Sequence, residues 1–248
     1  MNPGGVLRDR LQVHAKAGSS TARDRLAGAH APTRNDRAYS RLVDGRNLFR
    51  GMKLKLPEGQ FKAYLFDCDG TIADSMPLHY RAWKQALGEW NCEFGEELFY
   101  EWGGMPVAEI ISTLNERQGL RMPVETVASR KEALYYELLP QLKAVPDVLE
   151  HVEDAFGRIP FAIVSGSTRE SVTASLVSLK LLDRFDTMVC AGDYEKSKPD
   201  PEAFLLAAAN LGVAAEACLV FEDTEMGIKA AKAAGMGSVR VPPPWERS

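Results

Sequence analysis

Residues 61–71 are Phe-Lys-Ala-Tyr-Leu-Phe-Asp-Cys-Asp-Gly-Thr, an apolar run that ends in two carboxylates one residue apart. Apolar residues bounded by a glycine turn predict a buried strand. Open parallel α/β sheets bind ligands at the carboxyl ends of their strands, so we expect Asp67 and Asp69 to project into such a crevice. Neighbouring buried carboxylates repel each other unless a cation balances them, and a hard divalent cation prefers oxygen ligands. The stretch therefore predicts a divalent cation site, with Mg²⁺ as the first candidate.

The rest of the chain alternates apolar runs with helical patterns. The predicted strands lie at 159–164, 187–190, 218–221 and 238–241, and the helical segments between them lie near 147–156, 168–180, 201–211 and 225–234. Repeated strand, helix, strand order predicts parallel strands joined by right-handed crossovers. The predicted fold is α/β, a doubly wound, Rossmann-like parallel sheet with helices on both faces.

Between the first and second strands the pattern is helical only. The predicted helices cover about 78–90, 95–101, 106–118 and 123–142, which indicates a small α-helical cap inserted after the first strand. We therefore expect an N-terminal extension at 1–59, a core formed by 60–76 together with 144–248, and the cap at 77–143.

Polar groups follow the second predicted strand as well. It ends in Ser165-Gly166-Ser167, and a hydroxyl with a glycine near a helix N-terminus suits an anion. Ser167 or Thr168 is also expected to cap the following helix, and the two roles can coexist.

A lysine and two further acids follow later strands. Lys198 directly precedes Pro199, which stiffens the loop, and Glu222-Asp223 ends the next apolar run. Adjacent strand residues point to opposite faces, so both acids can serve one site only where the backbone turns.

These four stretches, in this order, resemble the motifs of the haloacid dehalogenase-like phosphohydrolase superfamily. The resemblance implies that Asp67 attacks phosphorus to form an aspartyl-phosphate while Asp69 serves as acid and base. It also implies that Lys198 neutralises the phosphoryl group and the nucleophile. The remaining implied roles are phosphoryl or substrate binding by Thr71, Ser165 and Gly166, and Mg²⁺ binding by Asp67, Asp69, Glu222 and Asp223. Of the last two, Asp223 is the firmer expected ligand, and Glu222 is expected to act directly or through water.

The cap sequence narrows the resemblance. The stretch His79-Tyr80-Arg81-Ala82-Trp83 resembles the subgroup of β-phosphoglucomutase and small sugar-phosphate phosphatases. The resemblance makes His79 a candidate for hinge control or for contact with the acid/base, and Arg169 a candidate substrate contact. A helical histidine is more often a packing residue, and Arg169 equally suits a solvated helix position.

Hydrolysis is favoured over phosphosugar mutase action. Mutases of this type carry a lysine and an arginine in a cap stretch that aligns with 103–107, and here that stretch is Gly-Gly-Met-Pro-Val. Loss of a bidentate arginine removes the means of holding a bisphosphate in two orientations. We expect a Mg²⁺-dependent phosphatase acting on a small phosphorylated metabolite, a sugar phosphate of the fructose-1-phosphate type, with mutase action as the alternative. Asp69 argues against dehalogenation.

Charge is unevenly distributed in the chain. Residues 1–51 hold nine Arg and one Lys against four Asp and no Glu, a net +6, which leaves −10 for the remainder of a chain of net charge −4. Their composition predicts disorder. A targeting peptide and a basic arm for nucleic acid are alternatives, the latter in a non-catalytic binding module. A natural translation start at Met52 is a further hypothesis.

Composition also leads to expectations about membrane spans, the cysteines and binding partners. No run of about 18 apolar residues occurs, so we expect no membrane span. The four cysteines have no paired spacing and are expected to be reduced thiols in a cytoplasmic protein. We expect a monomer whose partner is a small molecule rather than nucleic acid.

Overall fold

The structure of this protein is a computed structural model that describes residues 54–247. The predictions for the basic extension, including a start at Met52, concern residues that lie almost wholly outside this range.

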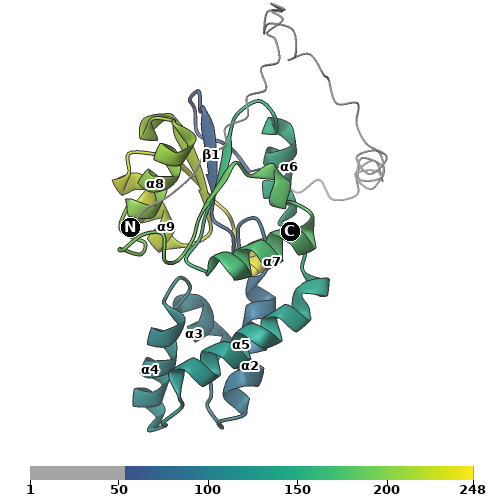
Figure 1. Ribbon diagram of the computed structural model, residues 1–248, viewed down its shortest axis with the longest axis vertical. Helices are drawn as coiled ribbons and strands as arrows, with labels where there is room; N and C mark the ends of the chain where they lie inside the picture. Colours follow the sequence, from purple (N-terminus) through teal and green to yellow (C-terminus); the bar gives the residue numbers. More distant parts are fainter. Residues whose placement is uncertain (1–53, 248) are drawn as a thin grey trace, which may run out of the picture. The chain divides into compact units, whose positions relative to one another are not determined.

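One parallel sheet of five strands forms the centre of the described part (Figure 1). Its strands are β1 (Ala63–Phe66), β2 (Phe161–Val164), β3 (Thr187–Val189), β4 (Cys218–Glu222) and β5 (Gly237–Arg240). The order is β3-β2-β1-β4-β5, and Leu65 of β1 pairs with Ala162 of β2 and Val220 of β4. The chain runs outward from β1 to β3 and then returns beside β1, which makes the carboxyl end of β1 the topological switch point where ligands bind.

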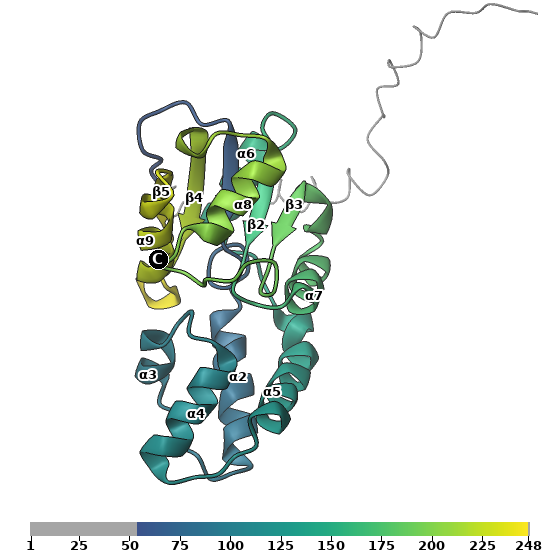
Figure 2. The ribbon, with the colours of Figure 1, turned by 60° about the vertical axis from the view of Figure 1, so that its left-hand side comes forward.

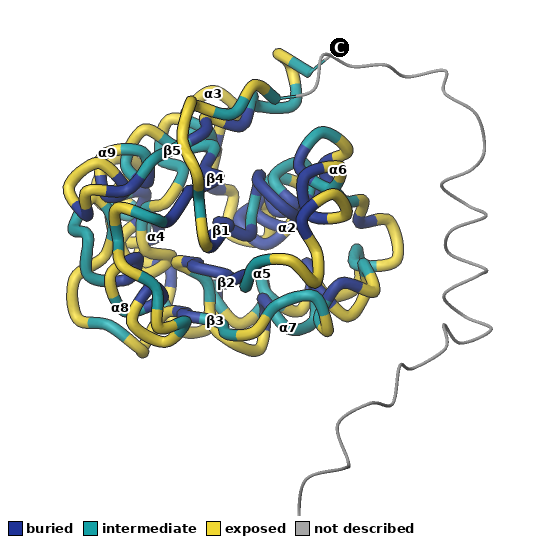
Figure 3. Tube along the Cα trace, turned by 90° about the horizontal axis from the view of Figure 1, so that it is seen from above, coloured by how far each residue is buried: buried dark blue, intermediate teal, exposed yellow. Residues whose placement is uncertain are grey.

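Two pairs of helices cover the two faces of the sheet (Figure 2). Helices α6 (Pro146–Ala155) and α7 (Arg169–Leu179) cover one face, and α8 (Glu202–Leu211) and α9 (Glu225–Ala233) cover the other. Successive strand residues alternate between two apolar clusters, as the period of a strand requires. The first cluster includes Phe66, Phe161, Ile163 and Phe221, and the second includes Leu65, Ala162, Val164 and Val220. The predicted three-layer α/β fold is confirmed, and buried segments run through its centre (Figure 3).

The segment between β1 and α6 folds into helices, as predicted. They are α2 (Met76–Gly88), α3 (Glu96–Glu101), α4 (Val107–Gln118) and α5 (Val124–Leu138). These helices share an apolar cluster of their own that includes Trp83, Phe94, Phe99, Ile111 and Leu114. The predicted helix over 123–142 is shorter, because α5 gives way to a 3₁₀ turn, η1 (Leu139–Gln141), where Pro140 has no N–H to continue the α-helical hydrogen bonds.

The two connections between cap and core are hydrogen-bonded to each other. The Asp74 N–H donates to the Lys143 carbonyl at 2.8 Å, and the Val145 N–H donates to the Ile72 carbonyl at 3.0 Å. This pairing agrees with a two-part core, and the predicted boundaries at residues 77 and 143 stay a prediction.

The described residues also include short 3₁₀ turns and all four cysteines. Short 3₁₀ turns occur at η2 (Leu182–Arg184), η3 (Ala215–Ala217) and η4 (Pro244–Glu246). The four cysteines are buried and free. Among residues 54–247, none of the helices has the length and apolarity that a membrane crossing requires.

Helix α8 offers a matched test of the packing against the sheet. Phe204 is fully buried and the adjacent Leu205 is 42% exposed. We expect Phe204→Ala to lower the free energy of unfolding by about 3–5 kcal/mol through a cavity, and Leu205→Ala to change it by less than about 0.5 kcal/mol. Chemical denaturation of both variants measures the difference, and equal losses would contradict the packing described.

Candidate active site

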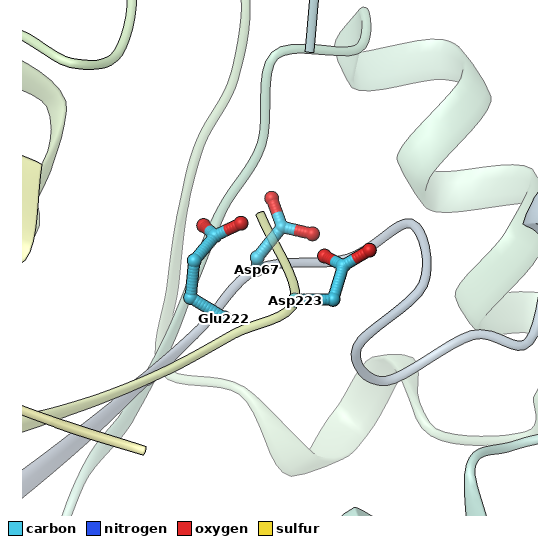
Figure 4. Close-up of side chains that lie close together, drawn as sticks. All are labelled: Asp67, Glu222 and Asp223. Atoms are coloured by element: carbon cyan, nitrogen blue, oxygen red, sulfur yellow. The ribbon is translucent and has the colours of Figure 1, made fainter. Parts of the chain in front are cut away.

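Three carboxylates meet at the carboxyl ends of β1 and β4. Asp67 follows β1, Glu222 ends β4 and Asp223 comes next, and one oxygen of each lies within 4.8 Å of the others. Figure 4 shows the three side chains rising side by side from these strand ends. Asp67 is 7% exposed and Glu222 is fully buried. Both acids of the Glu222-Asp223 pair therefore reach one cluster, since the backbone turns where the strand ends.

Lys198 is the cation among these carboxylates. Its Nζ donates to Asp67 Oδ1 at 2.7 Å, to Glu222 Oε2 at 2.7 Å and to the Val164 carbonyl at 3.1 Å. Burial by itself would lower the pKa of Lys198, but the two carboxylates outweigh burial and raise the pKa above its ordinary value. Lys198 therefore stays charged and ties β1, β2 and β4 together at this point.

One ammonium does not balance three carboxylates. Burial, and then the charge of Glu222, raises the pKa of Asp67 well above its ordinary value although Lys198 opposes the shift. Burial and Glu222 likewise raise the pKa of Asp223 to about 7. The excess negative charge and the all-oxygen donor set fit a hard divalent cation, which Asp67, Asp223 and Glu222 would hold.

Glu222 is fixed by its neighbours. Its Oε1 accepts hydrogen bonds from the Thr224 hydroxyl at 2.7 Å and the Thr224 N–H at 3.1 Å, and its Oε2 accepts from Lys198. A Cβ at Gly227 would overlap the Glu222 carboxyl group, so α9 can begin this close to β4 only with glycine at this position. Thr71 plays a similar part for Asp223, because its hydroxyl donates to Asp223 Oδ1 at 3.2 Å.

Asp69 lies apart from the three-carboxylate cluster. Its Oδ1 is 2.7 Å from the Ser75 hydroxyl and 3.1 Å from His79 Nε2, and its Oδ2 accepts from the Ser167 hydroxyl at 2.7 Å. Burial would raise the pKa of Asp69, but His79 and the three hydrogen bonds outweigh it and hold the pKa below its ordinary value. Of the four side chains predicted to bind the cation, the structure thus brings together three and directs the Asp69 carboxylate elsewhere.

His79 contacts Asp69, as one reading of the sequence anticipated. The imidazole is 7% exposed and stacks on the Tyr135 ring with 3.8 Å between centroids. Burial and the nearby Lys131 lower the pKa of His79 even though Asp69 opposes the shift. A neutral His79 with its proton on Nε2 therefore donates to Asp69 near neutral pH.

The second predicted motif lies beside this group. Ser165 is buried and its hydroxyl accepts the Ser167 N–H at 3.0 Å, while a Cβ at Gly166 would meet no atom within 4 Å. Thr168 is the residue that caps α7, accepting the Ser171 N–H at 3.3 Å. Ser167 is thus free of the capping role and holds Asp69.

The guanidinium of Arg169 is hydrogen-bonded beside β3, at the edge of the sheet. Its Nη2 donates to Asp193 Oδ2 at 2.6 Å and to the Met188 carbonyl at 3.0 Å. The structure does not bring this guanidinium to the cluster of Asp67, Glu222 and Asp223, and it gives the predicted substrate contact no support.

Three partners of the site were absent from the sequence prediction. Ser75 holds Asp69, Thr224 holds Glu222, and Tyr135 stacks on His79. Ser75 and Thr224 each stand immediately before a helix that follows a motif, which is a signal the sequence carried. Tyr135 lies on α5, far along the chain from His79, and no local pattern marks it.

A doubly wound parallel sheet with acids and a lysine gathered at its switch point defines an α/β enzyme whose chemistry lies at the carboxyl end of β1. Residues 64–241 match the family model described as haloacid dehalogenase-like hydrolase, and the chain belongs to this family. It is accordingly an enzyme, a phosphoric monoester hydrolase as predicted, and the non-catalytic alternative is wrong.

Relatives of known name lie within the same subgroup. Fructose-1-phosphate phosphatase YqaB of Escherichia coli is 34% identical over 183 residues, covering 73% of this chain and 97% of that protein. A phosphorylated carbohydrates phosphatase of Thermotoga maritima is 31% identical over 179 residues, covering 71% of this chain and 82% of that protein. The crystal structure of β-phosphoglucomutase from Clostridium difficile superposes with a TM-score of 0.65 at 25% identity, covering 72% of this chain and 83% of that one.

Gly227 provides a test of how Glu222 is held. We expect Gly227→Ala to lower the free energy of unfolding by about 1–3 kcal/mol, because the added methyl overlaps a buried carboxylate that is bonded on both oxygens. Gly88→Ala is the matched control, since a Cβ at this helical glycine meets nothing within 4 Å. Thermal denaturation compares the two, and a loss of stability no greater in Gly227→Ala than in Gly88→Ala would contradict the close approach.

The raised pKa values predict how pH acts on the metal-free protein. Because Asp223 binds its proton up to about pH 7 when folded and only to its ordinary, lower pKa when unfolded, its contribution to stability falls as pH rises through that window. Cation binding displaces the proton, so the gain in melting temperature on adding Mg²⁺ should grow between about pH 5 and pH 8.

Thermal denaturation with and without Mg²⁺ across this pH range measures the effect. Asp223→Asn should remove most of the Mg²⁺ gain, whereas Asp183→Asn, at an exposed aspartate in η2, should keep it. A gain independent of pH in the wild type would be evidence against proton displacement at this cluster.

Proposed function

We propose that this chain is a Mg²⁺-dependent phosphatase that hydrolyses a small sugar phosphate of the fructose-1-phosphate type through an aspartyl-phosphate on Asp67. The observation that carries the proposal is the contrast between two carboxylates one residue apart. Asp67 lies with Lys198, Glu222 and Asp223, whereas Asp69 is held separately by Ser75, His79 and Ser167. Such a difference in surroundings suits one nucleophile and one acid/base.

Charge balance supports the need for Mg²⁺. Without a cation, the raised pKa of Asp67 disfavours the ionised carboxylate that must attack phosphorus. Mg²⁺ bound by Asp67, Asp223 and Glu222 would supply positive charge that favours the ionised carboxylate and the developing charge on the phosphoryl oxygens. Lys198, already hydrogen-bonded to Asp67, supplies the second positive charge.

Asp69 is positioned for proton transfer. In the proposed reaction its carboxyl protonates the departing oxygen of the substrate and later removes a proton from the attacking water. Its three donors favour the ionised form, which suits the second step, and the first step requires that some of these hydrogen bonds be given up. Ser165 and Gly166, next to the Ser167 that binds Asp69, would receive the phosphoryl oxygens.

The substrate class is supported by the relatives and by the cap. Two relatives are named as phosphatases of fructose 1-phosphate and of phosphorylated carbohydrates. Hydrolysis is preferred to mutase action because the cap stretch 103–107 holds no cation for a second phosphate. The likeness to a β-phosphoglucomutase structure keeps mutase action as the second candidate.

Phosphate release from a panel of hexose and pentose phosphates with Mg²⁺ tests the function. We expect fructose 1-phosphate or a related sugar phosphate to be hydrolysed, and Asp67→Asn to lose at least about a thousandfold in turnover because the nucleophile is gone. Asp183→Asn, the same change at an exposed site, should keep wild-type turnover.

The same panel separates the two candidates. If β-glucose 1-phosphate became glucose 6-phosphate faster than inorganic phosphate appeared, the enzyme would be a mutase. A monomeric state and a cytoplasmic location complete the proposal, and light scattering coupled to size exclusion measures the former.

A further inference from the structure

The C-terminal segment 242–247 lies beyond the residues that match the family model, which end at Val241. It begins where the Val241 N–H donates to the Glu222 carbonyl at 2.8 Å, and it continues as Pro-Pro-Pro-Trp-Glu-Arg. Three prolines in a row restrict the backbone of this segment. We refer to residues 242–247 as the C-terminal strap.

Arg247 anchors the strap to the loop that leaves the candidate active site. Its Nη1 donates to Asp74 Oδ1 at 2.8 Å, its Nη2 to the Gly70 carbonyl at 2.7 Å and its Nε to the Pro242 carbonyl at 2.6 Å. Its side chain is 13% exposed. A guanidinium whose three nitrogens all donate, two of them to one loop, constrains that loop through a rigid planar fork.

The loop that Arg247 holds is part of the site. Gly70 has φ +89°, and a Cβ at this position would overlap the Asp223 carboxylate, so the Gly70 backbone lies directly against a proposed metal ligand. Asp74, at the other end of the loop, is bonded through its N–H to Lys143 in the second connection to the cap. Arg247 therefore contacts this loop at both ends, at Gly70 beside Asp223 and at Asp74 beside the second connection to the cap.

Trp245 joins the strap to the cap. Its ring packs edge-on against Tyr100 of α3, with 4.5 Å between centroids and 80° between planes, although the residue is 62% exposed. Just beyond α3, the cap approaches the core again, because a Cβ on Gly104 would lie 2.8 Å from Met226 Cε. Burial, and then Glu96 and Asp74, raises the pKa of Tyr100 to about 12 while Arg247 opposes the shift, which agrees with a phenol close to the anchored loop.

We propose that the C-terminal strap fixes the active-site loop and the cap together, with Arg247 as a positioning residue for the Gly70–Asp74 loop and Trp245 as the contact that holds α3. The two contacts have different consequences for catalysis. Loss of Arg247 frees the loop that lies against Asp223, which misplaces reacting groups and lowers kcat. Loss of Trp245 frees the cap, which weakens retention of the substrate and raises KM.

Hydrogen exchange tests the strap without any substrate, so its outcome is independent of the proposed function. Arg247→Met should speed amide exchange in residues 70–75 by about tenfold or more, since hydrogen bonds to a charged group are lost. Trp245→Ala should speed exchange in α3 and leave residues 70–75 as in the wild type. Arg130→Met and Trp90→Ala are the matched controls, an arginine paired with Glu89 and a tryptophan 37% exposed, and both should leave the two segments unchanged.

Steady-state kinetics with p-nitrophenyl phosphate and Mg²⁺ adds a second measurement. A general loss of stability would not change kcat in one variant and KM in the other. We expect Arg247→Met to lower kcat by about 10- to 100-fold with little change in KM, and Trp245→Ala to raise KM with kcat nearly kept. Should Arg247→Met fail to fold, Arg247→Lys serves instead. It keeps the charge beside Asp74 without the fork and should give intermediate exchange in residues 70–75.

Two results would overturn the proposal. One is wild-type exchange in residues 70–75 of a folded Arg247 variant. The other is faster exchange spread evenly over the sheet, which would make Arg247 a residue of general stability only.

Discussion

The buried ammonium of Lys198 is the interaction on which the site depends. It donates to Asp67 from β1, to Glu222 from β4 and to the carbonyl of Val164 at the end of β2. Without it, Asp67, Glu222 and the Val164 carbonyl would face one another with no positive charge between them. Removal of one partner from a buried charged group leaves the others uncompensated, which is among the costly defects a protein interior can carry.

With all three carboxylates ionised, the same cluster remains two positive charges short, because Lys198 supplies only one. Asp67 and Asp223 respond by holding their protons more tightly than isolated carboxylates do. A divalent ion would offset the repulsion between the carboxylates and favour loss of their protons, and this is why the site is predicted to depend on a cation. Asp69, one residue from Asp67, escapes this effect because three side-chain donors surround it.

The fold makes this division possible. β1 lies at the centre of the sheet, with β2 and β4 as its neighbours, so the residues at the ends of β2 and β4 converge on Asp67 although they stand about 100 to 150 positions from it in the sequence. Helices α2 and α5 bring His79 and Tyr135 to the same end of the sheet, where the two rings stack and His79 contacts Asp69. Through His79 and Tyr135, the cap helices α2 and α5 are thus linked directly to Asp69, the acid/base candidate.

Much of this could be predicted from the sequence, because the deciding patterns are local. The apolar runs of β1, β2 and β4 are buried, and each is followed at once by a charged or hydroxyl residue, namely Asp67, Ser165 or Glu222. The expectation that Asp67 and Asp223 are neighbours rests on strand ends that meet at one edge of the sheet, whereas Lys198 was placed with them only by its resemblance to the family's lysine that precedes a proline. Ser75 and Thr224 each stand immediately before a helix, which is a local signal of their positions.

What only the tertiary structure decided is the direction of each side chain and the partners it meets across the fold. Nothing local to Asp69 shows that its carboxylate turns toward Ser75 and Ser167 rather than toward the cluster, since Ser167 belongs to another strand end. Arg169 follows the second motif, yet an aspartate 24 positions away takes up its guanidinium. Arg247 reaches back to Gly70 over a separation of 177 residues, a contact that arises only once β5 has been placed beside β4. Sequence period fixes which residues are buried and where a strand ends, whereas hydrogen-bond partners distant in the chain are set by packing.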